Sequence, residues 1–266
     1  MSKPVLHVVK IGGHVIDNNH LLERFLLGLA KTGQQTLLVH GGGKMASQLA
    51  QQLGINQHIV DGRRITDAET LKIATMVYAG LINKQIVASL QALNSDAIGL
   101  SGADLNCIQA KKRAVKEIDY GFVGDLDASS VNASKLNALL KMQVIPVICA
   151  ITHDGRGQLL NTNADTIASA IATALSPDFM VHLHYCFEKK GILENPADES
   201  SVIRTLSFAR FASLKEQGII SSGMIPKLDN AFHALQKGVS TVNVGSSEEI
   251  KNMLSNSNCH ATQLCL

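Results

Sequence analysis

The residues best suited to chemistry in this 266-residue chain are two lysines and one aspartate, each placed beside a turn. Lys10 almost directly precedes a pair of glycines, and Lys227 lies in a Gly-Met-Ile-Pro-Lys turn that leads into an expected helix. A lysine at the start of a helix opposes the helix dipole, so Lys227 should have a reason beyond local stability. Asp165 ends the stretch Asn-Thr-Asn-Ala-Asp at 161–165. Two ammonium groups and one carboxylate can orient a phosphoryl group and neutralise its charge, with no covalent nucleophile.

Two glycine turns follow the first two expected strands. Apolar runs at 6–11 and 36–40 are typical of buried parallel strands, and they end at the glycines 12–13 and 41–43. Glycines at the carboxyl end of a strand, followed by a helix, let backbone N–H groups approach an anion closely. One such turn could simply be a tight strand-to-helix connection. Two of them at the sheet edge where open α/β folds bind ligands favour a site for phosphate and carboxylate groups.

Further polar residues fit the binding of a small acid. Arg64, at the end of an Asp-Gly-Arg-Arg stretch, offers a guanidinium suited to bidentate carboxylate binding. Asn161 and Asn163 place two amides just before Asp165. An alternative explanation of Asn163 and Asp165 is simple capping of the following helix. Together with the lysines and the glycine turns, these residues are suited to moving a phosphoryl group onto a small acid.

Other kinds of site are less well supported by the sequence. It contains no Gly-x-x-x-x-Gly-Lys-Ser/Thr loop, and the Gly-x-Ser-x-Gly element of serine hydrolases is incomplete around Ser101. His182 and His184 alternate on one face of an expected strand and could bind a metal ion. Because no third ligand is evident, we expect a packed or hydrogen-bonded histidine pair and no metal held by the protein.

Strands that alternate with helices along the chain indicate an α/β fold with a mostly parallel sheet and hairpin excursions. A Thr-x-x-Glu capping box at Thr66 and Glu69 predicts the start of a long helix that ends near Leu93. Its apolar residues lie around much of its circumference, so it is either central to the core or shared with a second subunit. The pattern restarts after 176–178, the best candidate for a boundary between two lobes.

Composition and charge narrow the class of protein. With 45% hydrophobic and 17% charged residues, the chain is globular rather than disordered. Its net charge of +2 gives no reason to expect a nucleic acid or a membrane as partner. No apolar stretch of about 18 residues is evident, so we expect no transmembrane helix. The five cysteines form no Cys-x-x-Cys pair, and reduced thiols in a cytoplasmic protein are the simplest explanation.

In their order and spacing, these motifs resemble those of the amino acid kinase family, and the resemblance covers nearly the whole chain. It implies an α/β fold in which a three-layer αβα sandwich surrounds a mostly parallel central sheet. It also implies two lobes, with residues 1–176 binding an acylated glutamate and forming a homodimer, and residues 177–266 binding ATP with Mg²⁺. The motifs lie at 10–13, 40–44, 61–66, 161–165 and 223–227.

The resemblance also implies roles for single residues. Lys10 and Lys227 would stabilise charge on the transferring phosphoryl group from opposite sides, and Asp165 would orient both ammonium groups. No residue is assigned to a metal, since Mg²⁺ would be held mainly by the nucleotide phosphates. The implied ATP contacts are Gly12, Gly13, Asn163, Ser221 and Gly223, and the implied substrate contacts are Gly42, Gly43, Arg64 and Asn161.

The reaction implied is ATP-dependent phosphorylation of the side-chain carboxylate of N-acetyl-L-glutamate, in arginine biosynthesis. One alternative is the same reaction on N-succinyl-L-glutamate, which would need a further cation near the acyl pocket, and Arg63 is the only nearby one to name. Another is a non-catalytic amino-acid sensor of the same fold. The presence of Lys10, Asp165 and Lys227 together argues against a sensor, because a sensor has no need of these charges.

Two features depart from the family pattern. The stretch 184–191 replaces a usual Ser/Thr-Asp-Val sequence, which leaves the exact ATP contacts of this region open. Arginine-inhibited members carry a helix before the first strand that joins dimers into hexamers, whereas here the strand begins by about Val5. We therefore expect a homodimer that arginine does not inhibit.

Overall fold

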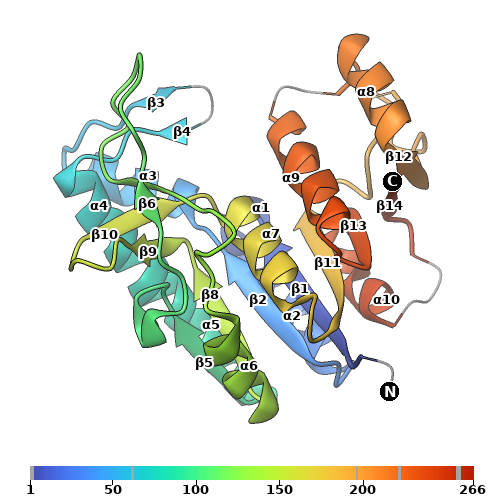
Figure 1. Ribbon diagram of the computed structural model, residues 1–266, viewed down its shortest axis with the longest axis horizontal. Helices are drawn as coiled ribbons and strands as arrows, with labels where there is room; N and C mark the ends of the chain where they lie inside the picture. Colours follow the sequence, from blue (N-terminus) through green and yellow to red (C-terminus); the bar gives the residue numbers. More distant parts are fainter. Residues whose placement is uncertain (1–2, 61–62, 196, 221–222, 256–258) are drawn as a thin grey trace.

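The computed structural model of this protein describes residues 3–266 except 61–62, 196, 221–222 and 256–258. Its centre is an eight-stranded sheet in the order β12-β14-β13-β11-β1-β2-β8-β5 (Figure 1). Neighbouring strands run parallel except β13 and β14, which are antiparallel. The strands are β1 (Val5–Ile11), β2 (Thr36–His40), β5 (Ala97–Leu100), β8 (Ile145–Cys149), β11 (Met180–Phe187), β12 (Thr205–Ser207), β13 (Thr241–Ser246) and β14 (Thr262–Cys265).

Helices cover both faces of this sheet, so the expected three-layer αβα arrangement is confirmed. In Figure 1, α7 and α9 lie in front of the sheet. Because both faces are covered, β1 and β2 are buried along almost their whole length and are rich in apolar residues. One layer contains α6 (Ala133–Lys141), α7 (Ala164–Leu175) and α9 (Ile225–Gln236), and the other contains α2 (Asn19–Ala30), α5 (Asn83–Ala92) and α10 (Ile250–Leu254).

Smaller elements extend from the edges of the sandwich. A four-stranded sheet has the order β6-β7-β10-β9, and β3 pairs with β4 in a two-stranded hairpin. The strands of the four-stranded sheet are β6 (Lys111–Lys112), β7 (Val123–Asp125), β9 (Ile151–His153) and β10 (Leu159–Thr162). The hairpin consists of β3 (Ile59–Val60) and β4 (Arg63–Arg64). Further helices are α1 (Gly13–Ile16), α3 (Gly43–Gln52), α8 (Phe208–Glu216) and the 3₁₀ helices η2 (Asp104–Asn106) and η3 (Ser247–Glu249).

The expected long helix is present as α4 (Ala68–Thr75), the π-helical segment η1 (Met76–Ile82) and α5 in direct succession. Its N-cap differs from the expectation. Asp67, not Thr66, caps the helix, because the Asp67 carboxylate accepts a hydrogen bond from the Thr70 N–H at 2.8 Å. The Thr66 hydroxyl instead donates to the Arg64 carbonyl at 3.1 Å, which fixes the chain just before the helix.

The same helix bears on the expectation that the chain has no transmembrane helix. By length and composition alone, the continuous helix Ala68–Ala92 is apolar enough to cross a membrane. This is weak evidence, because a core helix passes the same test and 44% of its most apolar window is buried inside the protein. Its α5 segment packs against β5, β8 and α2.

Candidate active site

Lys10, Asp165 and Lys227 converge from three different elements. Lys10 lies near the carboxyl end of β1, Asp165 in the first turn of α7 and Lys227 in the first turn of α9. The Lys10 Nζ is 2.7 Å from the Asp165 Oδ1, and the two residues are only 8% and 7% exposed. All three line one pocket, together with Tyr185, Cys186, Phe187, Met224, Leu228 and Val244.

The positive charges in this pocket keep the Asp165 carboxyl ionised. Burial by itself raises the pKa of the Asp165 carboxyl, but the ammonium groups of Lys10 and Lys227 outweigh it and hold that pKa below its usual value. Asp165 is therefore an anion at neutral pH. The Tyr185 hydroxyl donates to the Asp165 backbone carbonyl at 3.1 Å, which ties α7 to β11 at this point. The pocket thus holds two cations around one fixed carboxylate.

Asn163 explains why α7 begins where it does. Its side-chain oxygen accepts hydrogen bonds from the N–H groups of Asp165 at 2.9 Å and Thr166 at 3.1 Å, as an N-cap does. The capping explanation is therefore confirmed for Asn163. For Asp165 it is wrong, because this side chain pairs with Lys10 instead of capping the helix. An ATP contact of Asn163 stays a prediction.

The first glycine turn lies beside the Lys10 ammonium. Gly12 is the N-cap of α1, and its N–H donates to the Cys186 carbonyl at 3.2 Å. A Cβ added to Gly12 would meet only ordinary contacts, 3.7 Å from the Cys186 carbonyl oxygen and 3.9 Å from the Lys10 Nζ. At Gly13 it would lie 3.5 Å from an Asp17 carboxylate oxygen. Contacts among the described residues do not require glycine at these two positions.

The second glycine turn is constrained by the protein itself. Gly42 has φ of 153°, a region that favours glycine, and a Cβ there would overlap the Ile82 side chain and press on Tyr78. Packing against η1 therefore explains Gly42 without a ligand. Gly43 begins α3, and a Cβ there would lie 3.5 Å from the Arg64 Nη2. The turn consequently places the start of α3 against the Arg64 guanidinium.

The Arg64 guanidinium donates two hydrogen bonds through one of its nitrogens. Its Nη2 donates to the Gly43 carbonyl at 2.8 Å and to the Ser47 hydroxyl at 2.9 Å. Its Nη1 is buried and has no hydrogen-bond partner among the described residues. A buried donor without a partner is unfavourable by about 1–3 kcal/mol, and a ligand carboxylate would relieve this. The geometry fits the predicted carboxylate clamp.

Asn161 belongs to the same part of the molecule as Arg64. Its amide donates to the Thr66 hydroxyl at 3.1 Å, and that hydroxyl donates in turn to the Arg64 carbonyl. The backbone N–H of Asn161 also donates to the Phe122 carbonyl at 2.9 Å, which holds β10 in place. Hydrogen bonds thus connect three of the four implied substrate contacts. Arg64 bonds to Gly43 directly and is connected to Asn161 through Thr66.

The remaining implied ATP contacts are not brought into this arrangement. Ser221 lies outside the described residues. Gly223 is exposed, and a Cβ there would meet no atom of the described protein within 4 Å. The side chain of Arg63, considered for a succinyl carboxylate, also lies outside what the structure describes. The roles of these residues stay predictions.

Two candidate residues were missed by the sequence analysis. The buried Tyr78 of η1 lies beside Arg64, where burial raises the pKa of its phenol and the guanidinium opposes that rise. Asp17 follows α1, and one of its buried carboxylate oxygens has no hydrogen-bond partner among the described residues. Burial raises the pKa of Asp17, while Lys44 and His14 lower it. In the sequence, Asp17 could have been noticed because it lies four residues after Gly13, which is one helical turn.

Proteins of similar sequence are named acetylglutamate kinase. One from Cytophaga hutchinsonii is 49% identical over 260 residues, which cover 97% of this chain and 98% of the relative. One from Phocaeicola vulgatus is 52% identical over 240 residues, covering 90% of this chain and 93% of the relative. One from Bacteroides thetaiotaomicron is 51% identical over 246 residues, covering 92% and 95%.

Solved structures share the fold at lower identity. N-acetylglutamate synthase from Neisseria gonorrhoeae, complexed with coenzyme A and N-acetyl-glutamate, matches with a TM-score of 0.83 at 21% identity, over 100% of this chain and 60% of that chain. Carbamate kinase from Giardia lamblia bound to AMP-PNP matches with a TM-score of 0.71 at 15% identity, over 99% of each chain. The sequence profile of the amino acid kinase family matches residues 6–246. This chain therefore belongs to the amino acid kinase family.

Proposed function

We propose that this protein transfers the γ-phosphoryl group of ATP to the side-chain carboxylate of N-acetyl-L-glutamate, which gives N-acetyl-L-glutamyl 5-phosphate in arginine biosynthesis. Relatives named acetylglutamate kinase, about half identical over nearly the whole chain, support this substrate. The observation that carries the chemistry is the Lys10–Asp165 ion pair in one pocket with Lys227.

The reaction explains why the pocket needs cations rather than a general base. The substrate carboxylate is already an anion at neutral pH, so its oxygen can attack phosphorus without losing a proton. The new bond joins that oxygen to the γ-phosphorus, and the bond from the γ-phosphorus to the β–γ bridging oxygen breaks as ADP leaves. Negative charge spreads over the transferring group, where the ammonium groups of Lys10 and Lys227 would stabilise it. Asp165 would keep both in place.

The residues present fit Mg²⁺ held by nucleotide rather than by a protein cage. Mg²⁺ prefers six oxygen ligands. Among the described residues that line the pocket, Asp165 is the only carboxylate, and it is already paired with Lys10. The ion would therefore be bound mainly through the ATP phosphates, whose charge it neutralises.

The substrate would lie between the second glycine turn and β10. Arg64 Nη1 would bind the α-carboxylate, since it is buried and lacks a partner in the described protein. Asn161 would bind the acyl-amino group, and Gly42 and Gly43 would border the reacting end. ATP phosphates would lie at Gly12 and Gly13, with Asn163, Ser221 and Gly223 on the nucleotide side. The lobes would be residues 1–176 for substrate and dimerisation and 177–266 for ATP.

We also propose a homodimer in the cytoplasm. The helix Ala68–Ala92 exposes two large apolar side chains, Met76 at 54% and Leu81 at 47%, which a second subunit would cover. All five cysteines are free thiols, as suits a reducing compartment. Light scattering should return the mass of two chains, with or without arginine. A monomer or hexamer, or strong inhibition by arginine, would contradict this part of the proposal.

The substrate is tested by measuring ADP release with ATP, Mg²⁺ and either N-acetyl- or N-succinyl-L-glutamate. We expect the higher kcat/KM with the acetyl compound, because an unpaired buried succinyl carboxylate would cost about 1–3 kcal/mol. A preference for the succinyl compound of about tenfold or more would change the substrate but keep the chemistry. Tight binding of either compound with no ADP release would instead identify a sensor.

A further inference from the structure

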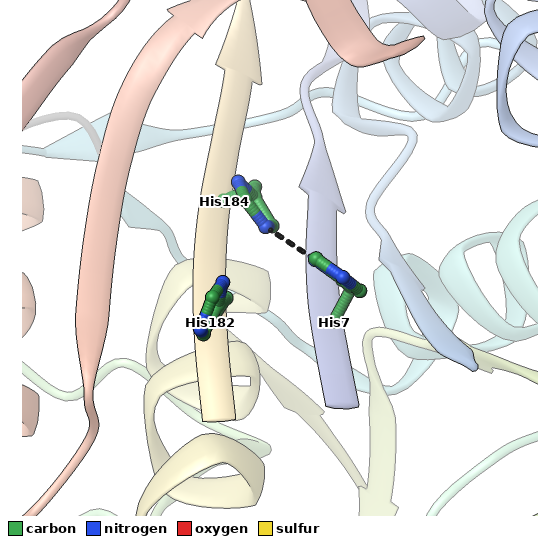
Figure 2. Close-up of side chains that lie close together, drawn as sticks. All are labelled: His7, His182 and His184. Carbon is green, nitrogen blue, oxygen red and sulfur yellow. Dashed lines mark hydrogen bonds between the residues drawn. The ribbon is translucent and has the colours of Figure 1, made fainter. Parts of the chain in front are cut away.

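Three histidines meet inside the protein, away from the residues described so far. His7 comes from β1, and His182 and His184 come from β11, as Figure 2 shows. One possible metal-binding atom of each lies within 4.8 Å of the others. Their exposed fractions are 1%, 7% and 0%, so the cluster is shielded from water. From the sequence alone, only the pair on β11 could be recognised.

Parallel pairing of the two strands creates this cluster. His7 is directly opposite His182, and His184 is two residues further along β11, so all three side chains project from the same face. Lys10 and Tyr185 are opposite each other on the other face, where Lys10 meets α7. The histidines therefore face the layer of α2, α5 and α10, and the sheet separates them from the kinase pocket.

Hydrogen bonds within the protein do not satisfy the whole cluster. His7 Nδ1 and His184 Nε2 share one hydrogen bond of 3.0 Å, drawn in Figure 2. The Asn243 amide donates to His184 Nδ1 at 3.4 Å. The buried His182 Nδ1 has no hydrogen-bond partner among the described residues. A buried nitrogen with no partner is unfavourable, and a bound ion would remove that penalty.

The protonation state of the three rings suits a metal ion. Burial, with a smaller contribution from the neighbouring His182, lowers the pKa of His7 to about 4. Burial also lowers the pKa of His182 and, well below the usual value, that of His184. All three are therefore neutral at pH 7, and each neutral imidazole offers a lone pair.

We propose that His7, His182 and His184 bind one divalent transition-metal ion, with Zn²⁺ as the expected occupant, at a structural site that joins β1 to β11. Neutral imidazole suits zinc, copper and nickel, whereas Mg²⁺ and Ca²⁺ prefer oxygen ligands that these rings do not offer. Zinc held at about 2.0–2.1 Å would bring the nitrogens to about 3.3 Å from one another. The rings would rotate toward the ion, and the bond between His7 and His184 would give way to it.

Asn243 would support this arrangement from outside the metal's ligand shell. A histidine that binds a metal through one nitrogen usually donates from the other. With the Asn243 amide turned over, its oxygen would accept from the Nδ1–H of His184, which leaves Nε2 for the ion. β1 carries Lys10, and β11 carries Tyr185, whose hydroxyl donates to the backbone carbonyl of Asp165. The ion would therefore link the two strands that position Lys10 and Asp165 for their ion pair.

The experiment measures metal content and needs no kinase assay. The full chain, free of any histidine tag, is unfolded in chelator, refolded with Zn²⁺, washed and analysed for zinc. We expect about one zinc per chain in the wild type and in the control His233→Gln, which changes an exposed histidine on α9. The His182→Gln variant should retain at most about a tenth of the zinc that the wild type binds. Equal zinc in His182→Gln, or less than about a tenth of an equivalent in the wild type, would overturn the proposal.

A second measurement keeps the test decisive if His182→Gln fails to fold. Refolding the wild type with Co²⁺ in place of Zn²⁺ reports the ligands through visible absorption. We expect the bands of a tetrahedral site with three imidazole ligands and one small exogenous fourth ligand, without the strong charge-transfer band of thiolate ligands. A thiolate spectrum would place the ion on the cysteines, and an octahedral spectrum would leave it in solvent. Either result would overturn the histidine site.

Discussion

The two glycine turns at the carboxyl edge of the sheet look alike in sequence but are constrained differently. At Gly42, a φ of 153° and the nearby Ile82 and Tyr78 leave no room for a side chain. At Gly12, an added Cβ would meet protein atoms at 3.7 Å and beyond. Packing therefore accounts for Gly42. For Gly12, the described residues give no such packing reason, and a ligand that approaches the backbone would explain it better.

The charged residues beside the two turns differ in the same way. Near Gly12, Lys10 is already paired with Asp165, so the charges that would meet the phosphoryl group are positioned before any ligand arrives. Near Gly43, Arg64 keeps one buried nitrogen without a partner in the described protein. In the proposed site, the first half is preorganised by its own residues, and the second half would be completed by its ligand.

The largest effect is expected in the first half. Lys10→Ala should lower kcat by about 10²–10³, because an ammonium aimed at developing charge is lost. The fold should survive, and circular dichroism checks this. The control is Lys72→Ala, which removes an exposed lysine that pairs with Glu69 and should leave kcat unchanged. If Lys10→Ala kept more than about half of the parent kcat, Lys10 would have no role in the transfer.

The next effect separates the two glycines. Gly42→Ala should destabilise the protein by about 1–3 kcal/mol, because the new methyl group would overlap Ile82 in a backbone conformation that disfavours alanine. Gly12→Ala should leave the free energy of unfolding within about 0.5 kcal/mol and raise the KM for ATP. Urea unfolding and steady-state kinetics of both variants test this. Similar losses of stability would remove the distinction between the turns.

The sequence was sufficient for features that depend on local pattern. The β1 strand, its glycine turn and the helix that Asn163 caps could all be predicted, because each depends on residues close together in the chain. The predicted N-cap of the long helix was wrong by one residue. The backbone of Thr66 forms a β-bridge with Gly121, and its hydroxyl donates to the Arg64 carbonyl. The local sequence allowed either Thr66 or Asp67 as the cap.

Features that depend on distant pairing could not be predicted. His7 joins His182 only because β1 pairs with β11 across the centre of the sheet. The packing reason for Gly42 needs Ile82, which the π-helical segment η1 brings against the turn. In both cases the residue types were visible, but their partners depend on the register of the sheet and the course of the long helix.

The second half of the site should respond in KM rather than in kcat. Arg64→Lys should raise the KM for the acylglutamate by roughly tenfold and change the KM for ATP little, because lysine cannot reproduce the guanidinium fork. Ser47→Ala is the matched comparison. It removes one hydrogen bond to the Nη2 of Arg64 and should raise the same KM by a smaller factor. A rise in the KM for ATP instead would move Arg64 to the nucleotide side.

The smallest effect concerns pH. Folding lowers the pKa of Asp165, so its ion pair contributes stability above the unfolded carboxyl value near 3.9 and loses it as pH falls through the lower folded value. Between pH 8 and 5 this group should therefore change kcat by less than about twofold. Asp165→Asn should reduce the loss of stability that urea unfolding detects between pH 5 and 3. An unchanged loss would mean that Asp165 is not an ionised partner of Lys10.

If Lys10 and Lys227 act on the phosphoryl group, removing either ammonium group must slow the chemical step itself. This is tested by single-turnover kinetics of wild type, Lys227→Ala and Lys72→Ala. Enzyme is in excess over ATP, N-acetyl-L-glutamate is saturating, and the acyl phosphate is trapped by hydroxylamine. We predict that Lys227→Ala slows the trapped step by about 10²–10³ and that Lys72→Ala does not slow it. A wild-type rate for Lys227→Ala, or no hydroxamate from the wild type, would contradict the account.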